Sequence, residues 1–321
     1  MSQVATADLG GSKLSLALVT SGLVVPLHRS RSPQSVEQLV CELQKALRFA
    51  DCDGVALAVA GITRNGREVI ESPNLSQFNG VPLASLVEQS LGTPCVVVND
   101  MVAAALAEGE YGELTSVKAG LVFTNSTGIG GSIFMRTRCE RRTLACEPGH
   151  MVLWPGGPVC SCGRRGCVEA VCSGGAVRRE LEAQFGGRIP AGMDPSQFLD
   201  EAAVRGEPWA IQKYSEIGWA MGLALANCLN LHSEIERIVL TGTFAMRGDS
   251  FLRTSTQRAI REHAMFVNHR SIAIEPSKLW PNGAHLGAAI AFYEGNKGSE
   301  GSHIPAIGSI ETDYLCASSP P

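Results

Sequence analysis

The chain is organised around the stretch His150-Met-Val-Leu-Trp-Pro-Gly-Gly-Pro-Val-Cys160-Ser-Cys162-Gly-Arg-Arg-Gly-Cys167-Val-Glu169. Three cysteines and a histidine lie within eighteen residues, separated by glycines and prolines that favour tight turns. Four nitrogen and sulfur ligands at short spacing suit tetrahedral zinc, and four protein ligands leave no position open for water. We therefore predict a structural zinc site at His150, Cys160, Cys162 and Cys167.

Disulfide bonds are the alternative for these cysteines, and the spacing disfavours them. Cys160 and Cys162 are too close in sequence for an easy bridge, and the chain shows no secretory context. Gly163 and Gly166 allow the backbone to fold back so that the thiolates can converge. Glu147 and Glu169 bracket the stretch, so a metal that fixes His150 would also fix where these carboxylates point.

Composition restricts the classes of protein that the chain can belong to. Its 321 residues, 45% hydrophobic and 18% charged, suffice for one large or two medium domains. The net charge is -4 and no Lys/Arg run is present, so we expect no nucleic-acid partner. The stretch 217–231, the longest apolar candidate, is too short to span a membrane. Eleven cysteines, several in apolar stretches, favour a reducing, cytoplasmic location.

The N-terminal segment reads as strand, glycine turn, strand. A short apolar strand ends at Asp8, Gly10 and Gly11 form the turn with Ser12 and Lys13, and strands follow at 14–19 and 23–27. Bare backbone N–H groups in such a turn can bind a phosphate. A plain β-turn with a solvated lysine is the alternative, and the segment alone does not decide between them.

The same pattern recurs at 119–135. A strand at 119–124 leads into the glycine-rich turn 125–131 and then into a strand from Ile133. Both copies are followed by helices and by buried apolar strands, which are 54–60 and 95–98 in the first copy. The repetition predicts a duplicated α/β unit.

Asn99 and Asp100 end the strand at 95–98, and an alanine-rich helix follows from Met101 to Glu108. Ligand sites in α/β sheets lie outside the carboxyl ends of strands. Asp100 can therefore cap the helix or accept a proton from a substrate, and its position alone leaves both interpretations open.

The remaining elements follow from hydrophobic periodicity. We expect further helices at 35–50, 82–91, 168–185, 195–204, 208–231, 249–263 and 284–294, strands at 237–241 and 271–275, and a small-residue turn at Gly242-Thr243. Residues 296–321, rich in glycine, serine and proline, read as a flexible tail.

Five motifs now match a known family in order and spacing. They are Asp8-Leu-Gly-Gly-Ser-Lys13, Asn99-Asp100, Ser126-Thr-Gly-Ile-Gly-Gly131, Glu147-Pro-Gly-His150 and Cys160-Ser-Cys-Gly-Arg-Arg-Gly-Cys-Val-Glu169. Together they resemble the ROK family (repressor, open reading frame, kinase) over residues 4–295, and the cysteine signature is highly specific. The resemblance implies a duplicated, two-lobed, actin-like (ribonuclease-H-like) α/β fold with a zinc knuckle. Its expected lobes are 1–118, with the helix 284–295 packing back on it, and 119–283.

The resemblance also implies an activity, the ATP- and Mg²⁺-dependent phosphorylation of a hexose at its 6-hydroxyl. Asp100 is implied as general base, in a cleft shared with the sugar-binding residues. The implied sugar-binding residues are Asn74, Asn99, Asp100, Glu147, His150, Glu169 and Gly61, with His150 serving both sugar and zinc. The implied nucleotide-binding residues are Asp8, which would help to position Mg²⁺, and Gly10, Gly11, Ser12, Lys13, Thr127, Gly128, Gly130, Gly131, Gly242 and Thr243. A homodimer is expected from the resemblance alone.

Several positions depart from the family pattern, among them Met101, Val102, Ser126 and Pro148. We expect glucose or a related hexose as substrate; the alternative is an amino or N-acetylated hexose, such as N-acetylmannosamine, N-acetylglucosamine or a 3-amino sugar like kanosamine. Two other classes compete. A sugar-sensing ROK regulator carries a DNA-binding domain ahead of the first strand, and here the Asp8 motif begins almost at residue 1. A zinc-stabilised sugar-binding module would not need Asp100 or the glycine turns.

Overall fold

The computed structural model describes residues 2–48, 50–138 and 140–295, and these form two compact units. Unit 1 comprises the chain up to Ala103 together with the segment from Ala284, and unit 2 comprises Ala104–Gly283. The tail expected at 296–321 lies outside the described residues. The lobe boundary expected after residue 118 stays a prediction.

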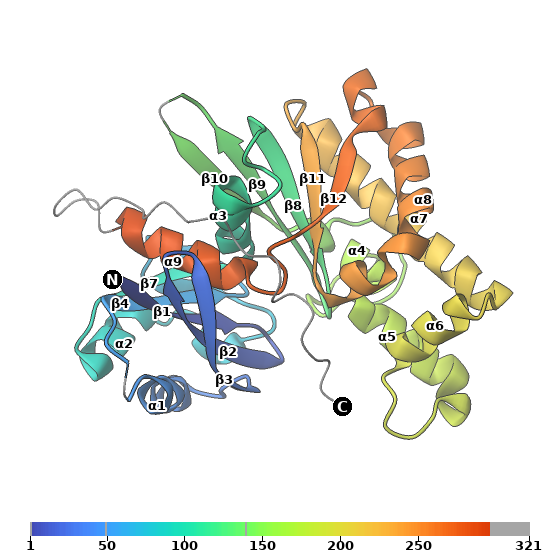
Figure 1. Ribbon diagram of the computed structural model, residues 1–321. Coiled ribbons are helices and arrows are strands. Elements are labelled where there is room, and N and C mark those ends of the chain that lie inside the picture. Colours follow the sequence, from blue (N-terminus) through green and yellow to red (C-terminus); the bar gives the residue numbers. More distant parts are fainter. Residues whose placement is uncertain (1, 49, 139, 296–321) are drawn as a thin grey trace. The chain divides into compact units, whose positions relative to one another are not determined.

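Unit 1 contains a mixed five-stranded sheet in the order β3-β2-β1-β4-β7 (Figure 1). Its strands are β1 (Gln3–Leu9), β2 (Lys13–Thr20), β3 (Leu23–Arg31), β4 (Gly54–Val59) and β7 (Cys95–Asn99). The first three strands are antiparallel, whereas β1, β4 and β7 run parallel. The carboxyl ends of these parallel strands therefore meet at one edge of the sheet. Every residue of β4 is buried, as its continuous apolar run predicts.

Helices cover both faces of this sheet. Alternation along β1 places Ala5, Ala7 and Leu9 in a core with α1 (Val36–Leu47) and α2 (Leu83–Leu91). Thr6 points to the opposite face, where it contacts His285 of α9 (Gly283–Gly295). A small hairpin of β5 (Ile62–Arg64) and β6 (Glu68–Glu71) and a 3₁₀ turn, η1 (Ser76–Phe78), complete the unit. Helix α3 (Asp100–Tyr111) continues from unit 1 into unit 2.

Unit 2 repeats this architecture, which confirms the predicted duplication. Its sheet has the order β10-β9-β8-β11-β12, again with three antiparallel strands followed by parallel ones. The strands are β8 (Ala119–Asn125), β9 (Ile129–Arg136), β10 (Arg141–Cys146), β11 (Arg237–Thr241) and β12 (Ala273–Pro276). The helices are α4 (Val168–Cys172), α5 (Gly174–Phe185), α6 (Pro195–Val204), α7 (Pro208–Leu231) and α8 (Thr243–His263), with 3₁₀ turns η2 (Pro148–His150), η3 (Gly186–Arg188) and η4 (Val267–Ser271).

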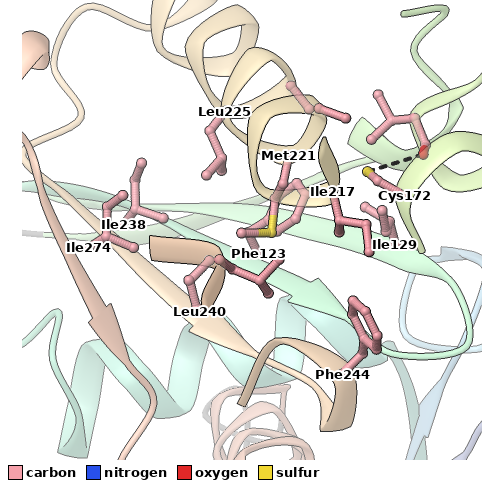
Figure 2. Packing of buried hydrophobic residues seen from close by; sticks show 14 of the residues in the cluster. Phe123, Ile129, Cys172, Ile217, Met221, Leu225, Ile238, Leu240, Phe244 and Ile274 are labelled. Carbon is pink, nitrogen blue, oxygen red and sulfur yellow. Dashed lines mark hydrogen bonds between the residues drawn. The ribbon is translucent and has the colours of Figure 1, made fainter. Parts of the chain in front are cut away.

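The core of unit 2 lies between its sheet and α7. Figure 2 shows Ile217, Met221 and Leu225 of α7 packed over Phe123 and Leu240 of the sheet. Each such buried side chain contributes about 1.5–3 kcal/mol relative to exposure. As predicted, α7 is a long helix with a buried central face.

Two predictions about helices of unit 2 were wrong. The helix expected at 168–185 is two helices, because the backbone at Ser173 is extended (ψ 156°) and its hydroxyl caps α5. Helix α8 begins at Thr243 rather than at Asp249, so the small-residue turn expected after β11 is reduced to the bend at Gly242. Strands β5, β6 and β10 were not expected. The described helices include none with the length and hydropathy needed to cross a membrane.

Candidate functional site

The four predicted zinc ligands lie together in unit 2. One ligand atom from each of His150, Cys160, Cys162 and Cys167 lies within 4.8 Å of all the others. Cys160 Sγ is 3.6 Å from His150 Nδ1, and Cys162 Sγ is 3.7 Å from Cys167 Sγ. Zinc–sulfur bonds of about 2.3 Å in a tetrahedron place ligand atoms at comparable separations, so the cluster fits zinc. All three thiols are free, so the disulfide alternative does not hold in this structure.

Backbone turns bring these ligands together. Cys160 N donates to Arg164 O (2.8 Å) and Gly163 N donates to Cys160 O (3.0 Å), which closes the tight turn between the first two cysteines. Gly163 and Gly166 adopt positive φ values of 82° and 75°. Both glycines are thus needed where the sequence predicted the fold-back.

The three thiols differ in how readily they ionise, because burial raises the pKa of Cys160 and raises that of Cys167 to about 12. Burial opposes ionisation of Cys162, yet the Arg164 amide, the neighbouring thiols and His150 together lower the pKa of Cys162 to about 7. The thiolate is the form that binds zinc. His150 Nδ1 faces Cys160 Sγ, so the zinc-facing nitrogen of this ring is Nδ1, and a role of Nε2 in sugar binding stays a prediction.

Glu169 joins the knuckle to the second glycine turn. Its Oε1 accepts a hydrogen bond from Ser161 Oγ (2.8 Å), and its Oε2 accepts one from the backbone N–H of Ile129 (3.0 Å). Partial burial raises the pKa of the Glu147 carboxyl; His150 opposes this shift, and the charge of Glu169 adds to it. The three predicted sugar-binding residues of unit 2 therefore act on one another.

Two segments of unit 2, the start of α5 and the bend at Gly242, lie against the second glycine turn and the end of β8. Gly175 N donates to Thr127 O (3.1 Å) from the first turn of α5, and Gly174 N donates to Asn125 Oδ1 (3.1 Å). Gly242, with φ 92°, lies so close that a Cβ there would be 2.5 Å from Thr124 Oγ1. The predicted nucleotide residues at 127–131 and 242–243 thus lie together, beside a helix N-terminus that favours anions.

Each of these segments is anchored in the core of unit 2. The turn is shorter than the expected 125–131, because Asn125 ends β8 and Ile129 already begins β9. Ile129, Cys172 at the end of α4 and Phe244 in the first turn of α8 belong to one buried cluster (Figure 2). Apolar anchors on each side restrict the turn to one position.

The first glycine turn, in unit 1, is also held in place by specific hydrogen bonds and by packing. Gly10 N donates to Lys13 O (3.0 Å), Ser32 Oγ donates to Gly10 O, and Ser32 N donates to Ser12 O (3.3 Å). Asn74 packs on the turn so closely that a Cβ on Gly11 would lie 2.7 Å from the Asn74 Cβ. Partial burial and the Arg29 charge lower the pKa of Lys13, whereas Asp8 raises it. Asp8 and Lys13 thus interact electrostatically beside the first glycine turn.

Asn99 and Asp100 take different roles at the start of α3. Asn99 Oδ1 accepts hydrogen bonds from Met101 N (3.0 Å) and Val102 N (2.9 Å), so Asn99 caps the helix. Its Nδ2 donates to Gly61 O (2.9 Å), which leaves one amide hydrogen for a substrate. Asp100 Oδ1 accepts from Met101 N (2.8 Å), which fixes the carboxylate at the carboxyl end of β7.

Sequence reasoning missed several residues that build these sites. Ser161 orients Glu169, Ser32 closes the first glycine turn, and Ser173 with Gly174 and Gly175 creates the helix start beside the second turn. The Ser-Gly-Gly run was a visible signal, since serine is a preferred N-cap. The contacts of Ser161 and Ser32 depend on the tertiary fold and left no local signal.

A family model described as the ROK family matches residues 4–294. The chain therefore belongs to the ROK family, and its motifs and fold agree with that assignment.

Curated relatives are sugar kinases. The N-acetylmannosamine kinase of Citrobacter koseri is 30% identical over 293 residues, covering 88% of this chain and 96% of the relative. The N-acetylmannosamine kinase of Escherichia coli O127:H6 is 35% identical over 191 residues, covering 56% of this chain and 64% of that relative. In the second alignment the chain thus spans slightly less than two thirds of its relative.

Solved structures share the fold. The ROK family glucokinase from Streptomyces griseus, in complex with glucose and AMPPNP, superposes with a TM-score of 0.77 at 25% identity, covering 90% of this chain and 98% of that one. A ROK family transcriptional regulator, a homolog of the E. coli MLC protein, gives a TM-score of 0.75 at 25% identity, covering 91% of this chain and 79% of that one. The fold alone therefore does not separate kinase from regulator.

Proposed function

We propose that this protein is an ATP-dependent hexose 6-kinase whose substrate is an N-acetylated hexose, with N-acetylmannosamine as the first candidate. The observation that carries this proposal is the similarity to an N-acetylmannosamine kinase over 96% of that relative's length. The comparisons thus favour the N-acetylated alternative over glucose, which the sequence led us to expect first. Cytoplasmic location and a homodimer belong to the same proposal as expectations.

Asp100 is the proposed general base. It accepts the proton of the sugar 6-hydroxyl as that oxygen attacks the γ-phosphorus of ATP, while the Met101 N–H holds the carboxylate in position. Asn99 supports this role because its Oδ1 caps α3 at Met101 N and Val102 N, with Asp100 sharing the Met101 amide. Phosphoryl transfer needs little else in covalent chemistry.

The sugar hydroxyls are the proposed partners of Glu147, Glu169 and His150 Nε2, with Asn99, Gly61 and Asn74 as further contacts. A neutral sugar needs paired acceptors and donors, and buried polar groups left unpaired by a wrong sugar cost affinity. His150 and the three cysteines would hold the zinc ion, which would be structural because four protein ligands would leave no position open for a substrate.

The two glycine turns are the proposed phosphate sites. Backbone N–H groups at 10–13 and 127–131 bind phosphate oxygens, and the N-terminus of α5 adds a favourable dipole next to the second turn. Asp8 is the proposed ligand that positions Mg²⁺ with the phosphates. Gly242 and Thr243 are proposed to lie near the adenosine.

Glucose is the second candidate substrate, because the S. griseus structure is that of a glucokinase bound to glucose. The test is a coupled ADP-release assay over N-acetylmannosamine, N-acetylglucosamine, glucose, mannose and kanosamine. We expect kcat/KM for N-acetylmannosamine to exceed that for glucose by roughly tenfold or more, since a missing or extra polar group changes discrimination at least that much. A higher kcat/KM for glucose would reverse the assignment, and no activity on any sugar would favour a sugar-sensing regulator.

A further inference from the structure

We propose that the zinc knuckle positions the second glycine turn through Ser161 and Glu169, so that metal binding at the knuckle and nucleotide binding at the turn are coupled. The nucleotide half of this inference rests on the proposed function, in which the turn 127–131 binds ATP phosphates. The knuckle half rests only on contacts within unit 2.

The Glu169 carboxylate is a bridge with one oxygen on each side. Oε1 accepts from Ser161 Oγ (2.8 Å), a residue that lies between the predicted zinc ligands Cys160 and Cys162. Oε2 accepts from Ile129 N (3.0 Å), at the end of the glycine turn. Hydrogen bonds to a charged acceptor are stronger than those between neutral groups. The Glu169 carboxylate therefore couples the position of the Ser161 hydroxyl to that of the Ile129 amide.

Ser161 is the donor that matters once the metal is bound. Cys160 Sγ also lies 3.8 Å from Glu169 Oε1 and can donate only as a thiol. As a zinc ligand Cys160 has lost its proton. Ser161 Oγ is then the one side-chain donor from the knuckle that reaches Oε1 among the residues that the structure describes.

A movement of the Glu169 carboxylate would also displace the turn, because the two are in direct contact. A Cβ on Gly128 would lie 2.6 Å from Glu169 Oε2, so the carboxylate rests directly on the turn. On the other side Gly149, next to the zinc ligand His150, packs against the Ile129 carbonyl so closely that a Cβ would overlap it. The knuckle and the turn therefore share two contacts, one through Glu169 and one through Gly149.

Loss of zinc should therefore also loosen the second glycine turn. Without the metal the 160–162 loop is no longer fixed, the Ser161 hydroxyl leaves Oε1, and Glu169 holds the Ile129 amide less firmly. By linkage, a nucleotide that needs the ordered turn raises the affinity for zinc by the same factor as zinc raises the affinity for the nucleotide.

The direct test is hydrogen exchange of the Ile129 amide in the full-length protein, without any ligand. Exchange should accelerate at least several-fold in Ser161→Ala and on chelation of zinc, because amide protection reports local opening. Ser161→Thr retains the hydroxyl and should stay within about twofold of the original protein. Arg165→Ala is the matched control, since Arg165 lies in the same knuckle and its Nε contacts only Gly156 O (3.4 Å). Metal analysis of each variant shows whether zinc is retained.

The second readout is the Kd for Mg-AMPPNP in the absence of sugar. In zinc-loaded Ser161→Ala the Kd should rise roughly three- to tenfold, and it should stay unchanged in Ser161→Thr and Arg165→Ala. Unaltered Ile129 exchange in both Ser161→Ala and the chelated protein would overturn the inference. If the original protein bound no nucleotide, the proposed kinase function would fail, while the exchange experiment would still decide whether the knuckle holds the turn.

Discussion

At the scale of single residues, Asn99 and Asp100 show how a strand end divides two tasks between neighbours. The sequence left capping and proton acceptance equally open for Asp100, because both need a carboxylate at the same place. The structure gives the cap to Asn99, whose Oδ1 accepts from two amides of the first turn of α3. In the proposed mechanism the carboxylate of Asp100 accepts the substrate proton, while its Oδ1 also accepts from Met101 N.

Asp100→Asn should abolish phosphate transfer and leave sugar binding largely intact. The amide is nearly isosteric and keeps an oxygen for Met101 N, but it cannot accept the hydroxyl proton. We expect kcat to fall about 10²- to 10⁴-fold, the usual contribution of a general base. Calorimetric Kd values for the sugar should change less than about threefold. Full activity in this variant would remove Asp100 from the mechanism.

His285 is a buried histidine that the sequence did not single out. Its Nδ1 lies 2.8 Å from Thr6 Oγ1, and its Nε2 lies 3.2 Å from Ser15 Oγ. Thr6 Oγ1 donates to Ala17 O, so it accepts from Nδ1–H, and Ser15 donates to Nε2. Burial lowers the pKa of His285, although the Asp8 charge opposes this, and the ring is neutral in the folded protein at pH 7.

A lowered histidine pKa makes stability fall at acid pH. Between the folded pKa and the unfolded value of about 6.5, the unfolded chain binds more protons than the folded one. The contribution of His285 is therefore complete above pH 6.5 and is lost as pH falls, by at most about 1.4 kcal/mol per pH unit. Denaturant unfolding of the original protein and of His285→Gln between pH 7.5 and 5 should show a smaller acid loss in the variant. Parallel pH profiles would mean that the imidazole titrates alike in both states.

At the scale of elements, periodicity sufficed where burial is one-sided or complete. It predicted α7 and α6 closely, and continuous apolar runs predicted the buried strands β4 and β7. It failed at 168–185, where helical spacing continues across Ser173 although the backbone breaks there to start a second helix. Strand β10 escaped notice because it is a short, partly exposed edge strand whose first half, Arg141-Arg-Thr143, is polar.

Gly175→Ala tests whether the second glycine turn depends on the start of α5. A Cβ on Gly175 would overlap the carbonyl oxygen of Thr127, a backbone group that cannot move without the turn. We expect a loss of about 1–3 kcal/mol in unfolding free energy and a weaker Kd for Mg-ATP. Gly186→Ala at the other end of α5 is the matched control, since nothing lies within 4 Å of its Cβ and its backbone is right-handed (φ -48°). Equal behaviour of the two variants would show that the turn does not depend on α5.

At the scale of the whole molecule, the candidate site could be predicted because its residues sit at strand ends and in turns of a duplicated sheet. The motifs at 8–13 and 126–131 occupy equivalent hairpins, β1–β2 and β8–β9. The supporting contacts could not be predicted, since Ser32, Ser161 and Gly175 reach their partners only through the fold. The local sequence thus indicates which residues form the candidate site, whereas tertiary packing determines which contacts hold them in place.

Zinc should account for a measurable part of the stability of the whole protein. We expect about one zinc per chain in the purified protein, held by His150, Cys160, Cys162 and Cys167. At free zinc a thousandfold above its Kd, the metal stabilises the folded state by about 4 kcal/mol. Chelation or Cys162→Ala should lower Tm and weaken sugar binding through disorder around His150. Absence of zinc from purified protein would contradict the knuckle assignment.

Phosphorus NMR of the products formed from ATP and N-acetylmannosamine tests the central claim most directly. We predict that ADP and a sugar phosphomonoester on carbon 6 accumulate in equal amounts, with little inorganic phosphate. Unchanged ATP, or ADP accompanied only by inorganic phosphate with every hexose tried, would contradict a sugar kinase.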